Sequence, residues 1–537
     1  MLRDTTRRLA GRASGLHKGW VLVALCLAAL VINVDVTIVN VALPSLVREL
    51  GATTTNLQWV VDAYTLVFAA LILAAGSVSD RVRRKGVLLF GLGVFAAGSL
   101  LGSLCTTPGQ LIAARAVMGF GAAAMFPSTL SLLTNVFTER RERAQAIGLW
   151  GATTGVGVAT GPIVGGWLLE HFWWGSVFLF MVPLAAAIAV MVAVAVPTSK
   201  DPTAPPMDWP GLLLSSAGMG LVVFGIIQAP HWGWSSAGTI ACIAAGVVVL
   251  AVFIDAERRR DRPMLDVGLF RNLRFTAASG SITIGFFTLA GFTFLITQYF
   301  QFVKGYSPLG TGVRLLPVAV SIAVAAFLGT KVAVGIGNKA VVASGLALFG
   351  GTLLWIATNS ASTSYLTIVG QMIAGGGGLG LITAPATEAI MGVVPREKAG
   401  VGSAVNDATR LFGAALGVAV VGSIATSLYT DRLGQTIPAG LPPDAANAAM
   451  GSLGGALGVA EGLVHSGLTG SATAVRSAAT AAFLHSMTGS LVVAGIIALA
   501  GVVMAAVLLP SRPGRASTPD DRPVDDGVTE TVPVAGS

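Results

Sequence analysis

An acidic residue lies inside an apolar run near the start of the chain. The run extends from Trp20 to Pro44, and Asp35 and Asn40 interrupt it. It is long enough to cross a membrane, because about 20 apolar residues at roughly 1.5 Å each span a ~30 Å bilayer core. A carboxylate there costs several kcal/mol unless it is paired, hydrated or protonated. We interpret Asp35 as a functional intramembrane acid; the alternative is an acid that snorkels from a helix end.

A second apolar run contains the candidate partner of this acid. Arg115 follows Leu111-Ile-Ala-Ala, just inside the run. By residue count, Asp35 and Arg115 both lie in the outer halves of their spans. We therefore expect an intramembrane pair whose acid can bind and release a proton if desolvation offsets the effect of the guanidinium on its pKa. The alternative is a static ion pair with a structural role only.

Other polar residues interrupt later spans and are candidate substrate or coupling residues: Asp62, Asp407, Arg410, Glu388, Gln298 and Tyr299. Asp62 is either a solvated rim residue or a contact for a cationic substrate. Asp407 and Arg410 stand three apart on one helix, so they either neutralise each other or act on a ligand. We expect Glu388 to be solvated at the inner end of its span.

The elements that position these residues are membrane helices. The chain has 537 residues, of which 54% are hydrophobic and 11% charged, and its mean hydropathy is +0.79. A soluble domain carries about 25% charged residues, so the composition predicts an all-α polytopic membrane protein. Fourteen transmembrane helices are expected, at approximately 19–43, 57–78, 86–105, 110–133, 144–168, 175–196, 210–229, 237–256, 275–302, 310–330, 340–358, 365–390, 400–427 and 479–509.

The positions of the basic residues predict the orientation. Most of the 33 Lys and Arg residues fall in the termini and in the loops on one side of the predicted spans. By the positive-inside rule, both termini are then cytoplasmic in a multi-pass protein of the inner membrane. This topology accounts for the net charge of +8, so the charge does not indicate nucleic acid binding.

A weak internal repeat predicts two six-helix halves. Span four, Arg115 to Pro127, resembles span twelve, Gly375 to Pro385, and each is followed by a charged turn. This maps span one onto span nine and leaves two inserted helices between the halves, as in many secondary transporters. The expected divisions are a basic arm 1–18, an N-terminal half 19–200, two inserted linker helices 201–262, a C-terminal half 263–510 with an external loop 428–478, and a disordered tail 511–537. Apolar stripes around Ala445–Val464 favour a helical hairpin on the outer surface within the external loop.

The turn after span two carries a mechanistic motif. It contains Gly76, Asp80, Arg81, Arg84 and Lys85, and the spacing resembles the cytoplasmic signature loop of the major facilitator superfamily. In that superfamily the loop latches the two halves in one state. Arg83 stands where the pattern has glycine. Without the resemblance, the basic cluster would be a topology anchor only.

Span five carries a glycine motif. Gly157, Gly161 and Gly165 are four apart on one helix face, which lets another helix approach closely, and Pro162 removes a backbone donor. Together with Gly166, the pattern is similar to the antiporter motif of drug exporters in this superfamily. Without the resemblance, it would be ordinary packing of small residues.

The first helix narrows the resemblance. Asp35, Thr37, Asn40 and Pro44 stand in the spacing of the first-helix motif of the fourteen-span drug:proton antiporters. Arg115 resembles that superfamily's fourth-helix arginine, and the resemblance implies that the Asp35–Arg115 pair couples proton binding to transport. The resemblance covers nearly the whole chain. It implies a multidrug efflux protein that exchanges an amphiphilic or cationic small molecule for protons by alternating access.

The resemblance leaves alternatives open. An exporter of an endogenous metabolite, lipid or siderophore would share these motifs, whereas an uptake symporter would not need the Gly161-Pro162 motif. A non-transporting receptor or scaffold would not need paired intramembrane charges. We expect no enzyme activity and no metal site, because the five histidines lie at loops or span ends without the spacing of ligands. We expect no use of a nucleotide, since the chain lacks a G-x-x-x-x-G-K-[ST] phosphate loop, and no cofactor besides the coupling proton. We expect a monomer in the lipid bilayer with no nucleic acid partner.

Overall fold

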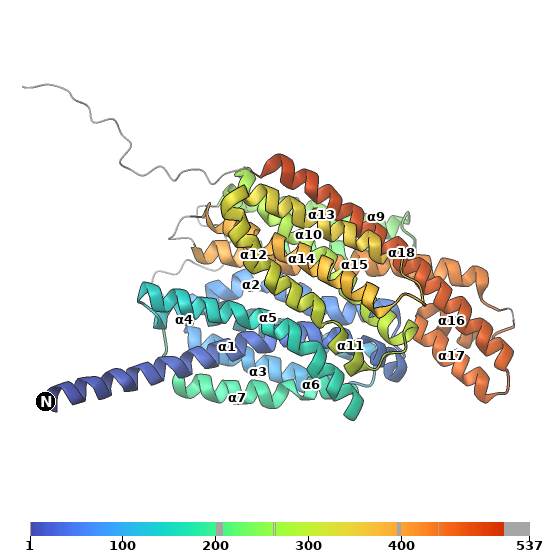
Figure 1. Cartoon of the computed structure of the whole chain (residues 1–537), viewed down its shortest axis with the longest axis horizontal. Helices are drawn as coiled ribbons and strands as arrows, with labels where there is room; N and C mark the ends of the chain where they lie inside the picture. Colours follow the sequence, from blue (N-terminus) through green and yellow to red (C-terminus); the bar gives the residue numbers. More distant parts are fainter. Residues whose placement is uncertain are drawn as a thin grey trace, which may run out of the picture.

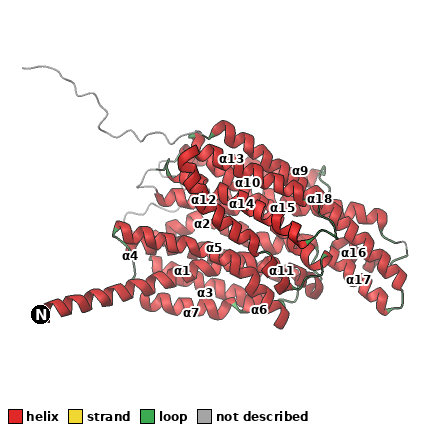
Figure 2. Cartoon of the chain, in the orientation of Figure 1, coloured by secondary structure: helices red, strands yellow, loops and turns green. Residues whose placement is uncertain are grey.

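The computed structural model describes residues 2–199, 208–260, 263, 265–394, 399–438 and 440–509. These residues form helices joined by short loops, and no strand occurs among them (Figure 2). The predicted tail 511–537 lies outside the described residues, as does the start of the predicted linker, 201–207. The expected all-α class is confirmed.

Fourteen of the described helical segments are long and apolar enough to cross a membrane, as the sequence predicts. Caps fix several of their ends. Thr53 and Asn56 form a reciprocal capping box at the start of the second span, and the Thr107 side chain accepts a hydrogen bond from Gln110 at the start of the fourth. Such caps satisfy backbone donors that the first helical turn leaves unpaired.

The elements follow one another along the chain as shown in Figure 1. The first six spans are α1 Leu2–Leu50, α2 Thr54–Arg81, α3 Arg84–Ser103, α4 Pro108–Val136, α5 Arg140–His171, and the broken span α6 Ser176–Leu179 with α7 Met181–Ala195. The inserted pair is α8 Trp209–Trp232 and α9 Ala237–Arg258. The remaining elements are η1 Val267–Arg271, α10 Leu273–Gln298, the π-helical turn η2 Tyr299–Val303, α11 Pro308–Arg314, α12 Leu316–Ile336, α13 Asn338–Ile356, α14 Tyr365–Met391, α15 Ala399–Thr436, α16 Pro443–Gly451, α17 Leu453–His465 and α18 Thr469–Leu508.

The two sets of six spans repeat the same helix contacts. In the first set, α1 packs against α5, α2 against α4, and α3 against α4 and α7. In the second set, α10 packs against α15, α12 against α14, and α13 against α14 and α18. Each contact in one set therefore has its counterpart in the other. The residue boundaries expected for the two halves remain a prediction.

The inserted helices lie along one seam between the halves. Helix α8 packs against α2 of the first half and α15 of the second, while α9 packs mainly against α8. The sequence predicts this pair, but it does not indicate which seam the pair covers.

The halves meet at one end of the bundle. We call the ends after two linker residues: the Gly51 end, where α1 passes into α2, and the Arg83 end, where α2 passes into α3. In the described chain, the hydrogen bonds between the halves lie at the Gly51 end. The Gln58 amide of α2 donates to the Ala419 carbonyl of α15 (3.0 Å), and the Gln301 amide of η2 donates to the Val41 carbonyl of α1 (2.9 Å).

The segment 428–478 is helical almost throughout. Helices α15 and α18 extend beyond the predicted spans 400–427 and 479–509, and α16 and α17 lie between them at the end of the bundle (Figure 1). Ala449, Leu453 and Ala456 are buried there, so the apolar stripes around 445–464 pack as helices, as the sequence favours.

Candidate functional site

A central cavity lies between the two halves. Helices α1, α2, α4 and α5 line one side, and α10, α11/α12 and α15 line the other. Its space free of protein atoms, including the open mouth, is about 1480 Å³. Phe68, Phe126, Phe286 and Phe292 contribute to largely apolar walls. A cavity of this kind suits an apolar or amphiphilic molecule.

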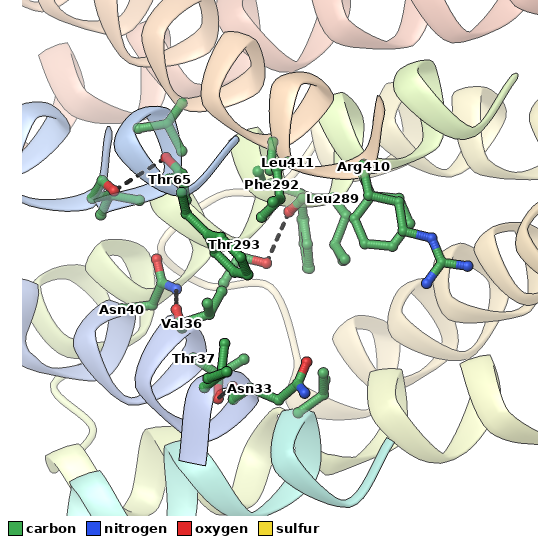
Figure 3. Close-up of a pocket in the computed structure, with 18 of the residues that line it drawn as sticks. Asn33, Val36, Thr37, Asn40, Thr65, Leu289, Phe292, Thr293, Arg410 and Leu411 are labelled. Atoms are coloured by element: carbon green, nitrogen blue, oxygen red, sulfur yellow. Dashed lines mark hydrogen bonds between the residues drawn. The ribbon is translucent and has the colours of Figure 1, made fainter. Parts of the chain in front are cut away.

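The first half contributes neutral polar groups to the cavity. Asn33, Thr37 and Asn40 of α1 line it (Figure 3), because residues spaced i, i+4 and i+7 share one face of a helix. The Asn33 amide donates to the Ala29 carbonyl at 2.8 Å, and the Asn40 amide donates to the Val36 carbonyl at 3.0 Å. Each bond uses one of two amide hydrogens, so the amides retain hydrogen-bonding capacity for a ligand.

The second half contributes a charged pair. Asp407 and Arg410 of α15 both line the cavity, and their nearest charged atoms, Oδ1 and Nη1, are 4.0 Å apart. Arg410 also donates to Thr387 Oγ1 at 3.1 Å and lies 5.4 Å from the Phe286 ring centroid. Since the pair is at the limit of contact, the carboxylate keeps acceptor capacity toward the cavity.

Asp35 and Arg115 are in direct contact. Arg115 Nη1 lies 2.7 Å from Asp35 Oδ2, and the side chains are 2% and 0% exposed. Arg115 Nε donates to the Val60 carbonyl at 3.0 Å, and the guanidinium lies 4.2 Å from the Tyr64 ring centroid. Three helices of the first half thus enclose the pair.

This buried pair is separate from the cavity. The cavity-lining face of α1 carries Asn33, Val36 and Thr37, whereas Asp35 points toward Arg115 of α4. Gly119, one turn after Arg115, lets α4 approach α2 closely, because a Cβ at this position would lie 2.5 Å from the Tyr64 carbonyl oxygen.

The glycines of α5 face α1. A Cβ on Gly157 would lie 2.6 Å from the Asn33 Cβ, and one on Gly161 would overlap Thr37 Oγ1. Gly165 meets Ile38 in the same way. The predicted small-residue face therefore packs α5 directly on the helix that carries Asp35.

The remaining residues of the α5 motif contact the other half. A Cβ on Gly166 would lie 2.5 Å from the Leu309 Cα of α11, and a Cβ on Gly312 would overlap the Pro162 carbonyl. The motif therefore forms part of the contact between the halves at the Gly51 end.

The loop between α2 and α3 lies at the Arg83 end. Arg81 is the last residue of α2, and a Cβ on Gly76 would lie 3.6 Å from Pro127 of α4. Arg84 N donates to the Ser199 carbonyl at 3.0 Å, and Lys85 Nζ donates to the Ala193 carbonyl at 2.7 Å. The Asp80 side chain lies outside the described residues.

Four of the six candidate substrate or coupling residues do not line the cavity. Asp62 is fully buried, so its interpretation as a solvated rim residue is wrong, and Glu388 is exposed. The Gln298 amide donates to the Phe294 carbonyl at 2.9 Å, and the Tyr299 hydroxyl donates to the Ser360 carbonyl at 2.7 Å. These two side chains are held by protein groups near the Gly51 end.

A family model supplies the identification. The model described as Major Facilitator Superfamily matches residues 25–418. The chain belongs to the major facilitator superfamily. It is therefore a membrane transporter and not an enzyme.

Within the superfamily, the chain is similar to several bacterial resistance proteins. It is 36% identical over 491 residues to the multidrug efflux pump LfrA of Mycolicibacterium smegmatis, covering 91% of this chain and 96% of LfrA. It is 31% identical to the methyl viologen resistance protein SmvA of Salmonella typhimurium, covering 82% of this chain and 89% of SmvA. A solved bacterial homologue of the human lysosomal transporter Spinster, 16% identical, has the same fold with a TM-score of 0.63, covering 91% of this chain and 97% of that one.

Sequence reasoning missed several polar residues as site residues. Asn33, Thr65 and Thr293 line the cavity of this superfamily member, and Gln58 and Gln301 connect its halves. Their signal was a polar side chain inside an apolar span, without the charge that singled out Asp35.

Proposed function

We propose that the chain is a proton-coupled antiporter that exports amphiphilic small molecules across the cytoplasmic membrane. The observation that carries this proposal is the ion pair Asp35–Arg115, buried beside an apolar cavity but separate from it. The relatives named above, a multidrug efflux pump and a methyl viologen resistance protein, support an exporter of foreign compounds.

The cavity chemistry favours substrates that combine an apolar body with a polar or cationic group. Phenylalanine rings provide contact area for planar molecules. Asp407 is the cavity-lining carboxylate among the described residues, and a cation there would replace the distant Arg410. The amides of Asn33 and Asn40 would add hydrogen bonds.

Asp35 is the proposed proton site. A proton on this carboxylate would remove the charge that holds the Arg115 guanidinium, and a buried charge that loses its partner is costly. Arg115 would then rearrange within α1, α2 and α4. Because Asp35 does not line the cavity, the drug and the proton would bind at different sites. Their binding would be mutually exclusive because each favours a different conformation of the transporter.

The closed Gly51 end supports a transport direction. The positive-inside rule assigns this end to the outside, so the conformation would be inward-open, with both termini cytoplasmic. Three glycines of α5 toward the Arg83 end, Gly148, Gly151 and Gly155, have no neighbouring atom within 4 Å of a Cβ position, which agrees with halves that separate there. The α2–α3 loop would latch the halves when this end closes.

The coupling ion supplies enough free energy for modest drug gradients. A charge moving down 100 mV yields about 2.3 kcal/mol, and each pH unit adds about 1.4 kcal/mol. Nucleotide hydrolysis is not required in this scheme.

The test uses everted vesicles with an acidic lumen and the dye ethidium. We expect dye uptake into the lumen by the unchanged protein and by Asp431→Asn, a control at an exposed acid of α15. Asp35→Asn should abolish uptake at equal protein content. Normal uptake in Asp35→Asn would refute the proton site, and uptake insensitive to the lumen pH would refute antiport.

A further inference from the structure

A second buried acid lies in α2 without an ionic partner. Asp62 is 0% exposed. Its Oδ1 accepts a long hydrogen bond from Thr65 Oγ1 (3.5 Å), and its Oδ2 has no hydrogen-bond partner among the described residues. The environment therefore differs sharply from that of Asp35, which has a guanidinium at 2.7 Å.

No cation on the neighbouring helices pairs with Asp62 in the described structure. On α4, Arg115 is engaged by Asp35 and the Val60 carbonyl. On α15, Arg410 donates to Thr387 Oγ1 and lies beside Asp407, and α8 carries His231 at its Gly51 end. The basic residues of α3 stand at the Arg83 end. An ionised carboxylate buried without a partner is very costly, so this environment favours the neutral acid.

Asp62 belongs to a stripe of polar side chains on one face of α2. Thr55, Gln58, Asp62 and Thr65 are spaced i, i+3, i+7 and i+10, which places them on one side of a helix. All four are buried. The stripe begins at the Gly51 end and ends at Thr65, which lines the cavity. We name it the α2 polar stripe.

The inserted helix α8 encloses the α2 polar stripe together with α15. The exposed His231 ring of α8 lies 2.9 Å from Thr55 Oγ1, at the outer end of the stripe. Further in, Gln58 donates to Ser423 Oγ of α15 at 3.1 Å. Val223 and Ile227 of α8 form an apolar cluster with Ala419 of α15. The α2 polar stripe is thereby shielded from lipid by α8, a helix that lies outside both six-helix halves.

We propose that Asp62 is a second proton-binding site, loaded from the Gly51 end through the α2 polar stripe. The inference rests on the proposed antiport and adds to it a second proton per cycle. In the conformation described here, Asp62 holds a proton while Asp35 is ionised and paired with Arg115. The two acids lie on adjacent helices and are in opposite protonation states in this conformation. Each therefore binds and releases its proton at a different point of the transport cycle.

The first test determines which of the two acids is protonated in the unchanged protein, so it needs no variant. Dicyclohexylcarbodiimide is apolar and adds to protonated carboxylic acids in membranes. At neutral pH, mass spectrometry of peptides should find the adduct at Asp62 and not at Asp35. Equal labelling of both acids, or labelling of Asp35 alone, would overturn the inference.

The second test measures protons released per ethidium bound or transported in proteoliposomes. Asp62→Asn imitates the neutral acid, and we expect it to halve the proton:drug ratio while drug transport persists. The exposed-acid control Asp431→Asn should leave the ratio unchanged. An unchanged ratio in Asp62→Asn would overturn the second site while leaving the proposed antiport intact.

A different pattern would identify failure of the antiport itself. If the unchanged protein transports ethidium without any proton movement, the proposed function fails, whatever the Asp62 variant does. If Asp62→Asn does not fold, labelling of the unchanged protein decides the question: an adduct at Asp62 and not at Asp35 supports the site, and any other labelling pattern contradicts it.

Discussion

The contact between α5 and α1 can be tested with one added methyl group. Gly161 faces Thr37, and a Cβ at Gly161 would overlap Thr37 Oγ1 and lie 3.1 Å from the Thr37 Cβ and 3.0 Å from the Val34 carbonyl oxygen. The Val34 carbonyl belongs to the backbone of α1 and cannot rotate away. Gly161→Ala should therefore push α5 off the helix that carries Asp35.

The magnitude follows from two opposing effects. Overpacking a tight contact costs typically about 1–3 kcal/mol, while alanine in a helix interior gains roughly 1 kcal/mol over glycine. Gly155 of the same helix provides the matched control, because no atom lies within 4 Å of its Cβ position. Since both substitutions share the propensity gain, their difference isolates the clash and should be about 1–3 kcal/mol.

The assay is thermal unfolding of purified protein in detergent, together with drug resistance of cells that express equal amounts. We expect Gly161→Ala to unfold at a lower temperature than Gly155→Ala and to confer less resistance. If the two variants unfold at the same temperature, the close packing of α5 on α1 is not as described here.

Two further predictions concern the closed end and the cavity. Gly312→Val should prevent closure of the Gly51 end, because a side chain there would overlap the Pro162 carbonyl. The distances between spin labels placed on the two halves across this end should then lengthen. Unchanged distances would contradict the contact between the halves. Asp407→Asn should weaken the equilibrium binding of cationic dyes by about tenfold, or ~1.4 kcal/mol. The binding of neutral dyes should stay the same. Equal losses of affinity for both dye classes would argue against a contact between Asp407 and a cation.

Much of the fold follows from composition and periodicity. Long apolar runs predict the fourteen spans, since each must satisfy its backbone hydrogen bonds as a helix in lipid. The packing partner of α8 could not be predicted in this way. Helix α8 is apolar on all sides, so its sequence does not distinguish the face that contacts α2 and α15 from the face that contacts lipid. The apolar stripes around 445–464 favour the helices α16 and α17, but an Ala- and Gly-rich composition does not indicate that they pack against α15 and α18.

The sequence predicts those site residues whose charge makes burial in a membrane span energetically costly. Asp35 and Arg115 could be paired from their depth in two spans, and the structure brings them to 2.7 Å. Asp62 carried the same signal, but its depth alone left the rim interpretation open. Gln298 and Gln301 are three residues apart, yet only the structure shows which of them reaches the other half.

Proton counterflow is the most direct test of the proposed coupling. Proteoliposomes are prepared with the cytoplasmic face outward, a pH dye in the lumen, and no pH gradient or membrane potential. When ethidium is added outside, its entry should drive protons out and make the lumen alkaline, and Asp35→Asn should abolish this change. Ethidium entry without any change in lumen pH, or with acidification of the lumen, would contradict the account.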